Sequence, residues 1–446
     1  MKMVVNYYLV KISVTLFLIN ALLVVTISSA QAKPPSQVKY SVQRQENTKM
    51  RESLVLPYAF STDDMGTVIG IGAMATGLYQ KQMTVGGTVY GGGDSKGLAL
   101  SLWDYRILDS ERFFFSAIGM VGEYPLLRAY SPLPGEFSAP SSPRAGSNDS
   151  SFDDFIQAEG SSNWWDVKLE YVLPWGSAEK QSMATYQLQG GLLANEVQIA
   201  DWNPFKTGTS VLIARQFNRY QQYRDEDGEL SGAVHGLELG LLYDNTDFPV
   251  NPSQGSSQYI AFSYNPQWLE SKEQWTFVEM EASKYFSLGA NSFAKQNIIA
   301  VNAWLGYSPS WQVSQDDAGN NLVTHNPPFL EGATLGGMYR LRGFRQNRFH
   351  DKAAIYATAE YRMTLDYNPI ANVRWLNFLH LDWLQTVFYV EGGRVSPTLH
   401  RDTLFSDWKT DVGVSLRALT AGILVRLDFT QSKEGTSTWL MVGHPF

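Results

Sequence analysis

The 446-residue sequence contains no cysteine, which excludes disulfide bonds and the lipid attachment that marks a lipoprotein. After residue 32 there is no stretch of twenty apolar residues, which excludes a helical membrane span in that part of the chain. The formal net charge of −8 argues against nucleic acid as a partner. Beyond residue 32, the chain can therefore be either a water-soluble protein or a membrane protein built from strands.

Signals for catalysis are few. The six histidines fall in no recognisable nucleophile motif, and a barrel phospholipase would need an outward-facing Ser–His pair with an orienting Asn or Asp. His350-Asp351 is better explained by loop polarity, and Asp316-Asp317 with Asn320-Asn321 by a solvated turn rather than a divalent ion. The sequence has no phosphate-binding loop or metal-ligand spacing. We therefore predict no enzymatic activity, no catalytic residue, no cofactor and no metal.

Residues 1–32 have the pattern of a secretory signal peptide. Lys2 and Lys11 give a basic start, residues 12–27 are almost all apolar, and Ala30-Gln31-Ala32 offers a cleavage site between small residues. An uncleaved anchor is the alternative, but about sixteen apolar residues are short for one. Residues 33–51 are polar, and we predict a short, disordered or loosely packed periplasmic arm.

The rest of the chain is rich in aromatic residues and glycine, with 13 Trp, 23 Tyr, 23 Phe and 37 Gly. From about residue 66 it is a succession of segments in which apolar and polar residues alternate, as in strands with one face in lipid and one in water. We count sixteen, an even number that places both termini in the periplasm, with fourteen and eighteen as alternatives. The segments are 66–78, 82–90, 97–107, 111–121, 162–172, 185–194, 208–216, 235–244, 256–264, 275–287, 296–307, 353–364, 384–394, 409–418, 422–431 and 436–446.

The predicted fold is an all-β, transmembrane antiparallel β-barrel of about sixteen strands over residues 52–446. A large soluble β protein of the periplasm is the alternative. By strand parity, the long connection 308–352 lies outside the cell and the long connection 122–161 lies in the periplasm. Periplasmic turns are normally short, so either a strand has been miscounted or 122–161 is an insertion, which is the interpretation we favour.

Charged residues indicate which face of a strand lines the lumen. Arg426 and Asp428 share one face of a late strand, and on the lipid face each would cost about 2–4 kcal/mol near the bilayer midplane. In the strand that follows the second long connection, Glu360 and Arg362 share a face with Tyr356. We predict that both faces look into a water-filled interior.

We predict that the first and last strands meet in a weak seam. Gly70 and Gly72 weaken the first strand, because glycine in a strand interior gives its neighbours little to pack against. Near the end of the last strand, Pro445 cannot donate a ladder hydrogen bond, and Phe446 follows it. We predict that this seam can open sideways and that its exposed edges can template an incoming strand. Ordinary fraying of strand ends is the alternative.

Residues 335–362 carry an arginine-rich loop around Gly343-Phe344 that runs directly into an alternating strand. This loop resembles the R-G-F/Y lid motif of the BamA/TamA family of bacterial surface-antigen barrels, with Arg342, Gly343 and Phe344 at the motif positions. The resemblance implies that the loop folds back into the lumen of its own barrel. A solvated basic loop that lies on anionic lipopolysaccharide is the alternative.

Two further segments resemble the same family. Residues 387–395 match its aromatic-x-acidic-x-Gly wall motif through Tyr389, Glu391 and Gly393, with Glu where Asp is usual. The resemblance implies that Glu391 is the luminal acidic partner of Arg342 and that Gly393 leaves room for the loop. Residues 235–265 resemble the strand–turn–strand of the family, and the end of the chain resembles the C-terminal signal of barrels.

Members of this family insert or export proteins at the bacterial outer membrane. The resemblance therefore implies an integral outer-membrane protein of a Gram-negative cell that assists insertion or translocation of proteins, in contact with outer-membrane lipid and lipopolysaccharide. Residues 33–51 are too few for a periplasmic POTRA repeat, so we expect a POTRA-less member that uses a separate periplasmic accessory protein to receive unfolded clients. A gated channel for small solutes or lipids is the alternative function.

Overall fold

The computed structural model describes residues 37–44, 52–62, 66–93, 95–107, 110–130, 143–195, 197, 199, 201–225, 228–268, 273–315, 317, 321–327, 331–368, 370, 373–374 and 379–446. The predicted signal peptide and, in the predicted turn, Asp316 and Asn320 lie outside these residues. Within them, no helix is both long and apolar enough to span a bilayer.

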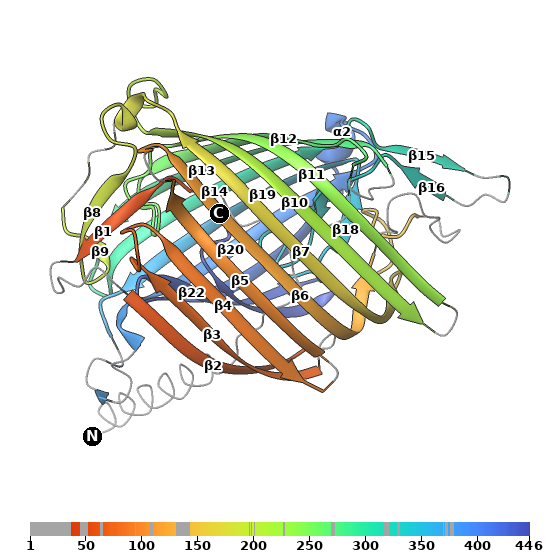
Figure 1. Ribbon diagram of the computed structural model, residues 1–446, viewed down its shortest axis with the longest axis horizontal. Coiled ribbons are helices and arrows are strands. Elements are labelled where there is room, and N and C mark those ends of the chain that lie inside the picture. The colour runs from red at the N-terminus through yellow and green to blue at the C-terminus, as the bar shows by residue number, and fades with distance from the viewer. Residues whose placement is uncertain are drawn as a thin grey trace.

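Sixteen strands of the described residues form one antiparallel sheet, and Figure 1 shows this sheet wrapped into a barrel. The all-β fold and the predicted number of barrel strands are therefore confirmed. In hydrogen-bonded order the strands are β2 (Glu52–Thr62), β3 (Gly66–Thr76), β4 (Thr84–Gly92), β5 (Ser95–Arg106), β6 (Phe113–Ala129), β7 (Ile156–Val172), β10 (Thr209–Asp225), β11 (Gly228–Asp244), β12 (Gly255–Asn265), β13 (Trp275–Gly289), β14 (Ala294–Tyr307), β19 (Ala353–Leu365), β20 (Leu381–Ser396), β21 (Lys409–Thr420), β22 (Ile423–Ser432) and β23 (Gly435–Val442).

Smaller elements occupy the two ends of the barrel. A three-stranded sheet lies at the left end in Figure 1, and a projecting hairpin and a short helix lie at the right end. A further two-stranded sheet belongs to the long connection before β19. These elements are β1 (Tyr40–Arg44), β8 (Ala184–Gln189) and β9 (Leu192–Leu193) in the three-stranded sheet, the hairpin β15 (Gln312–Gln315) and β16 (Asn321–Thr324), the pair β17 (Ala333–Leu335) and β18 (Phe349–Asp351), the 3-10 turn η1 (Gly176–Ala178) and the helix α2 (Arg401–Leu404).

Side chains alternate between the lumen and the outer surface along the barrel strands. In β19, Tyr356, Glu360 and Arg362 are buried on the inner face, as the sequence predicts. On the outer surface, Ile69 of β3 and Leu239 of β11 keep 66% and 62% of their area exposed. Large apolar side chains on the outside of a barrel match the hydrocarbon core of a bilayer.

Glycines inside the barrel make room for aromatic rings from the neighbouring strand. Gly70 of β3 faces Tyr58 of β2, and a Cβ atom at Gly70 would lie 2.6 Å from Cε2 of the tyrosine ring. Gly413 of β21 faces Tyr389 of β20 in the same way. Because a ring that lies flat on a glycine buries both backbone and ring, these glycines contribute to packing between strands.

The first barrel strand differs from the prediction. It is β2, whereas the predicted strands begin at 66–78, and residues 52–62 were predicted to belong to the barrel without being assigned a strand. Pro57 interrupts the alternation of β2, and a proline is tolerated there because an edge strand does not need every backbone N–H for a ladder. Gly70 and Gly72 therefore lie in the second strand, paired on both sides, and their assignment to the seam was wrong.

The segment 185–194 was predicted as a barrel strand, which is also wrong. It forms β8, which pairs with β1 on one side and with β9 on the other, outside the barrel sheet. β1 lies in the predicted loose arm 33–51, so at least residues 37–44 of that arm are ordered. The omission of β2 and the inclusion of 185–194 cancel in the strand count.

The long connection between β6 and β7 lies at the same end of the barrel as the long connection before β19. The His350 backbone N–H donates to the Gly146 carbonyl at 2.7 Å, and Arg144 pairs with Asp351 at 3.3 Å. The predicted periplasmic placement of 122–161 was therefore wrong, because counting β2 as the first strand reverses the parity of this connection. The connection 173–208, which contains η1, β8 and β9, lies at the other end (Figure 1).

The two edges of the sheet meet without a ladder. Among the described residues no hydrogen-bond ladder joins β2 to β23. Instead one apolar cluster joins the edges. It contains Leu54 and Leu56 on the inner face of β2, Ile423 and Val425 on the face of β22 opposite its luminal Arg426, and Ile370 and Leu379 of the connection between β19 and β20. This apolar cluster thus forms the seam.

Candidate functional site

The connection 308–352, hereafter the lid loop, enters the barrel. Its strands β17 and β18 pair with each other, and residues 336–348 between them form a compact turn. Gly336 has φ +103°, and a Cβ atom there would lie 2.9 Å from the backbone nitrogen of Arg348, so this turn depends on glycine. The turn places Arg342 at the centre of the lumen wall formed by β19–β23.

Arg342 is completely buried and contacts acidic side chains from three strands, β19, β20 and β22. Its Nε lies 3.0 Å from Oε1 of Glu391, its Nη2 lies 3.0 Å from Oε1 of Glu360, and its Nη1 lies 3.4 Å from Oδ2 of Asp428. The backbone N–H of Arg342 also donates to Glu391 at 2.6 Å. The guanidinium lies 3.5 Å from the ring centroid of Tyr389. The structure thus brings together Arg342 and Glu391, as the resemblance implied.

The other motif residues also contact the lid loop or its wall. The Gly343 N–H donates to Asp411 of β21 at 2.9 Å, and a Cβ atom on Gly343 would lie 2.6 Å from the Asp411 Cβ. Phe344 is buried against Phe349 of β18, with the ring centroids 5.2 Å apart. A Cβ atom on Gly393 would lie 3.0 Å from the lid-loop residue Leu335, so glycine there leaves room for the loop.

The wall around Arg342 contains more charged groups than the motif reveals. Glu360 accepts hydrogen bonds from Arg362 at 2.8 Å and from Arg417 at 2.8 and 2.9 Å, and Arg426 pairs with Asp428. The described side chains of this cluster comprise four arginines (342, 362, 417 and 426) and four carboxylates (360, 391, 411 and 428). Arg417 and Asp411 were not predicted, although both lie at alternating positions of a predicted strand.

A second ionic cluster holds the other side of the lid loop. Glu331 forms two hydrogen bonds with Arg215 of β10, at 2.8 and 3.0 Å, and an ion pair with Arg219 of the same strand. Asp166 of β7 bonds both arginines, and Glu238 of β11 lies 3.1 Å from Arg215. β10 is the seventh strand of the sheet and β20 the thirteenth, so Glu331 and Arg342 bind well-separated walls.

This second cluster was missed by sequence reasoning. The predicted strand ended at residue 216, so Arg219 fell outside it, although Arg215 and Arg219 continue the inward alternation of β10. Glu331 lies 116 positions from Arg215, and no local pattern connects the two.

The outer surface of the lid loop is covered by the connection between β6 and β7. Arg348 donates to the Ser150 hydroxyl at 2.8 Å and to its carbonyl at 2.7 Å, and pairs with Glu434 at 3.0 Å. Arg345 lies 3.8 Å from the ring centroid of Phe152. The lid loop is therefore covered by this connection at the barrel end, in addition to its contacts with the barrel wall.

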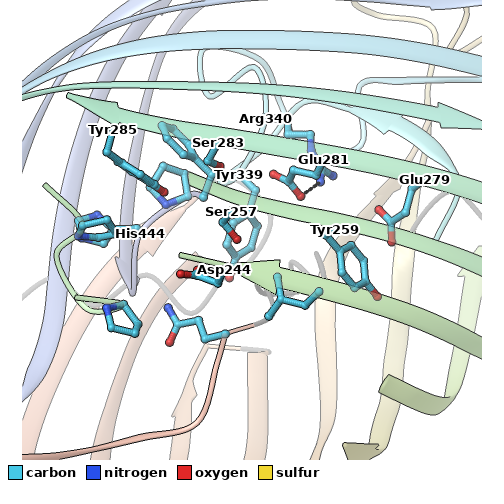
Figure 2. Close-up of a pocket in the computed structure, with 16 residues that line it drawn as sticks. Asp244, Ser257, Tyr259, Glu279, Glu281, Ser283, Tyr285, Tyr339, Arg340 and His444 are labelled. Atoms are coloured by element: carbon cyan, nitrogen blue, oxygen red, sulfur yellow. Dashed lines mark hydrogen bonds and ion pairs between the residues drawn. The ribbon is translucent and has the colours of Figure 1, made fainter. Parts of the chain in front are cut away.

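Below the lid loop the lumen holds a cavity, which Figure 2 shows. Tyr339 and Arg340 of the lid loop form one side, and Arg340 pairs with Glu281 of β13 at 3.2 Å. Asp244 and Glu279 also line the cavity. The lining therefore combines acidic and hydroxyl groups with apolar side chains such as Leu242.

The end of the chain also lines this cavity, which corrects the predicted seam. β23 ends at Val442, and the next residues turn into the lumen. His444 is buried: Arg417 donates to its Nδ1 at 2.8 Å, and its Nε2 lies 2.9 Å from the Val250 carbonyl. Because Nε2 must donate to a carbonyl, His444 is the neutral Nε2–H tautomer in this network.

Pro445 and Phe446 accordingly lie in the lumen, away from the contact between β2 and β22. The Phe446 ring stacks on Tyr285 of β13, with the centroids 6.4 Å apart, and the Arg362 guanidinium lies 5.0 Å from its centroid. Their assignment to the seam was wrong, because ring stacking and the His444 hydrogen bonds draw the segment away from the ladder with β22.

Comparisons with known proteins place the chain in a wider context. Residues 211–438 match a family model described as the Omp85 superfamily domain. Among solved structures, CdiB from Escherichia coli superposes with a TM-score of 0.51 at 10% identity, over 92% of this chain and 67% of that chain. This likeness shows the fold alone.

Two other structures overlap at lower TM-scores. BamA from Haemophilus ducreyi, in a crystal structure lacking POTRA domains 1–3, gives 0.46 at 13% identity, over 92% of this chain and 75% of that chain. CdiB from Acinetobacter baumannii gives 0.46 at 10% identity, over 88% and 59%. No curated protein sequence matches the chain.

Proposed function

The chain belongs to the Omp85 superfamily of outer-membrane barrels, and we propose that it assists the insertion or translocation of proteins at that membrane. The observation that carries this proposal is a lid loop that occupies the lumen and is held there by buried ion pairs to separate walls. A permanently open pore has no need of such a loop.

The seam between β2 and β22 supplies the second part of the mechanism. An edge strand that lacks a hydrogen-bonded neighbour presents backbone N–H and C=O groups in register for another strand. Separation of the two edges disrupts the apolar cluster of Leu54 and Ile423 without breaking a ladder, so β2 can become a template for a client strand by β-augmentation. Its clients are unfolded polypeptides delivered by a separate periplasmic accessory protein.

The lipid surroundings follow from the same geometry. The outward apolar side chains contact outer-membrane lipid, and the end that carries the lid loop and the β15–β16 hairpin faces lipopolysaccharide. We propose no catalytic role for any residue of this chain.

The test is to lock the seam. Cysteines in place of Leu56 and Val425, which pack in one apolar cluster, are oxidised in the assembled barrel, and the amounts of client outer-membrane proteins are measured. We expect client levels to fall on oxidation and to recover on reduction. The control replaces Leu98 and Val121, which pair across β5 and β6 on the outer face, and should leave client levels unchanged. Unchanged client levels with a fully formed 56–425 disulfide would contradict the proposal.

A gated channel for small solutes or lipids is the second candidate, because of the cavity below the lid loop. Planar-bilayer recording separates the two. A large, steady conductance from the unmodified protein favours the channel. Rare, brief openings that become more frequent in Arg342→Ala favour a plugged protein translocator.

A further inference from the structure

The barrel end opposite the lid loop is crossed by the sheet β1–β8–β9, at the left in Figure 1. β1 pairs with β8 in parallel, from Tyr40 beside Ala184 to Arg44 beside Leu188. β8 and β9 belong to the connection between β7 and β10, so the strand that completes this sheet comes from the segment that precedes the barrel. Val38 and Lys39, directly before β1, and Tyr40, its first residue, fix the position of β1.

Lys39 occupies an acidic site on the inner wall. Its Nζ lies 2.8 Å from Oε2 of Glu170 on β7 and 2.6 Å from Oδ1 of Asp104 on β5, and only 5% of the residue is exposed. Ser116 of β6 also donates to Glu170, at 3.3 Å. Two carboxylates from different strands therefore converge on one ammonium group, a geometry that favours a cation at this position.

The residues on either side of Lys39 fill apolar sites. Val38 is buried in a cluster with Phe114, Val172 and Val211, which belong to β6, β7 and β10. Tyr40 packs against Tyr186 of β8 and Phe248, in both cases with ring centroids 6.2 Å apart in an edge-on arrangement. The wall thus recognises an apolar, a cationic and an aromatic side chain in succession.

The same small sheet reaches the far wall of the barrel. Arg44 forms an ion pair with Asp382 at the start of β20, and the Trp383 indole N–H donates to the Gly191 carbonyl at 3.1 Å. Leu192 packs against Trp383 and Leu419. The sheet therefore spans the mouth from β5–β7 to β20–β21.

The rest of β1 makes fewer side-chain contacts. Val42 keeps 37% of its area exposed, and Gln43 is also exposed. Apart from the Arg44 ion pair and buried Ser41, β1 is held by the ladder with β8, which accepts any extended backbone. Recognition therefore resides in the short run Val38–Lys39–Tyr40.

The edge of β8 and the ends of β5–β7 at this mouth form a groove that holds residues 38–40. We propose that this groove is a binding site for an extended peptide with an apolar–cationic–aromatic triplet. The chain's own residues 38–40 occupy it in cis, and a client segment with the same pattern competes for it in parallel pairing with β8. This inference deepens the proposed function, on which it rests for the class of ligand, a polypeptide. Release of β1 removes one strand of the sheet that crosses the mouth.

The charge of Lys39 is maintained at any physiological pH. Burial disfavours the ammonium form, but the attraction of Asp104 and Glu170 outweighs it and raises the pKa of Lys39 above its usual value.

The test uses the full chain with Lys39→Glu, which places a carboxylate against Asp104 and Glu170 and expels the segment from the groove. The probe is a fluorescent peptide of residues 37–44, QVKYSVQR. We expect the variant to bind this peptide about tenfold more tightly than the unmodified barrel, because the groove is vacant. A peptide with Glu in place of Lys should not bind. Equal affinity of the variant and the unmodified barrel for QVKYSVQR would overturn the proposal.

Two variants serve as controls. Lys39→Arg keeps the cation and should behave as the unmodified protein. Gln43→Glu adds a negative charge at an exposed position of the same strand and should leave peptide affinity unchanged. A gain in affinity in Gln43→Glu equal to that in Lys39→Glu would show a general charge effect and would also overturn the proposal.

If Lys39→Glu fails to assemble, a protease site between residues 44 and 52 provides a second route. Cleavage after assembly makes residues 37–44 an exchangeable ligand, and added QVKYSVQR peptide should displace them. Retention of the cleaved segment in a large excess of peptide counts against the proposal. Peptide binding needs no client, so a barrel that binds the peptide but supports no client assembly contradicts the proposed function and leaves this site intact.

Discussion

Arg342 and Glu331 extend from the same lid loop to different walls of the barrel, where each meets side chains of opposite charge. Arg342 contacts Glu360 and Glu391 on β19 and β20, and Glu331 contacts Arg215 and Arg219 on β10. The lid loop therefore cross-links two parts of the sheet in addition to blocking the lumen. Displacement of the loop must break both ionic clusters.

Arg342→Ala should release the lid loop most strongly. It leaves four carboxylates of the cluster facing three arginines, and loss of one partner of a buried pair costs about 3–5 kcal/mol. We expect faster proteolysis within the lid loop and more frequent channel openings. Arg342→Lys keeps the charge but loses the forked geometry, so its effect should be intermediate. If Arg342→Ala is as resistant to protease as the unmodified protein, the loop is held by other contacts.

Glu331→Gln should have a smaller effect than Arg342→Ala. With Glu331, three carboxylates surround Arg215 and Arg219; without it, Asp166 and Glu238 still balance the two arginines. We expect a loss of lid-loop protection of about 1–3 kcal/mol, measured by native-state proteolysis. The double variant with Arg342→Ala then shows whether the anchors act together. A loss equal to that of Arg342→Ala would mean that the two anchors contribute alike.

Gly70→Ala and Gly72→Ala form a matched pair within β3. A Cβ atom at Gly70 would lie 2.6 Å from Cε2 of the Tyr58 ring and still closer to its Cζ, whereas at Gly72 the nearest ring atom of Tyr58 is 3.8 Å away, an ordinary contact. Overpacking of this kind costs about 1–3 kcal/mol, so Gly70→Ala should unfold at lower urea concentration while Gly72→Ala changes little. Urea titration in detergent micelles measures both. Equal urea midpoints for the two variants would show that the Tyr58 ring shifts to accommodate the added Cβ atom without a loss of stability.

His444 should make stability depend on pH in the mildly acidic range. Burial, with the positive charges of Arg362 and Arg417, holds the pKa of His444 well below its usual value, against a weaker opposing effect of Glu360. Arg426 acts in the same direction as the other arginines. In the unfolded chain, histidine takes up a proton near pH 6.5. Its contribution is therefore complete above about pH 6.5 and is lost as the pH falls, by at most about 1.4 kcal/mol per pH unit.

The measurement compares the unmodified protein with His444→Gln, which stays neutral and retains one donor and one acceptor. Free energies of unfolding at pH 7.5 and 5.5 are taken for each, so that other titrating groups cancel in the difference. We expect the unmodified protein to lose more stability than His444→Gln. An identical loss in both would show that His444 becomes protonated in the folded barrel without penalty.

Sequence reasoning located features that repeat or that are local. The alternation of Glu360 and Arg362 with apolar residues placed them on the inner face, because a charge on the lipid face is too costly. The pairing of Arg342 with Glu391 came from resemblance to a family motif, since no spacing rule connects residues on a loop and on a separate strand.

The remaining features could not be predicted because tertiary contacts decide them. β2 was not predicted because Pro57 interrupts its alternation, although an edge strand tolerates a proline. Residues 436–446 continue to alternate in sequence, but stacking of Phe446 on Tyr285 takes its last residues out of the strand. Lys39 stands in a polar segment with no apparent partner, and only the fold brings Asp104 and Glu170 to it.

The apolar cluster that joins Leu54 of β2 to Ile423 of β22 has a mechanical consequence for the barrel as a whole. Hydrogen-bond ladders permit only discrete shifts of register, whereas methyl groups in contact can slide past one another by any distance. The barrel can therefore widen or narrow gradually at this seam, while every ladder among the described strands stays intact.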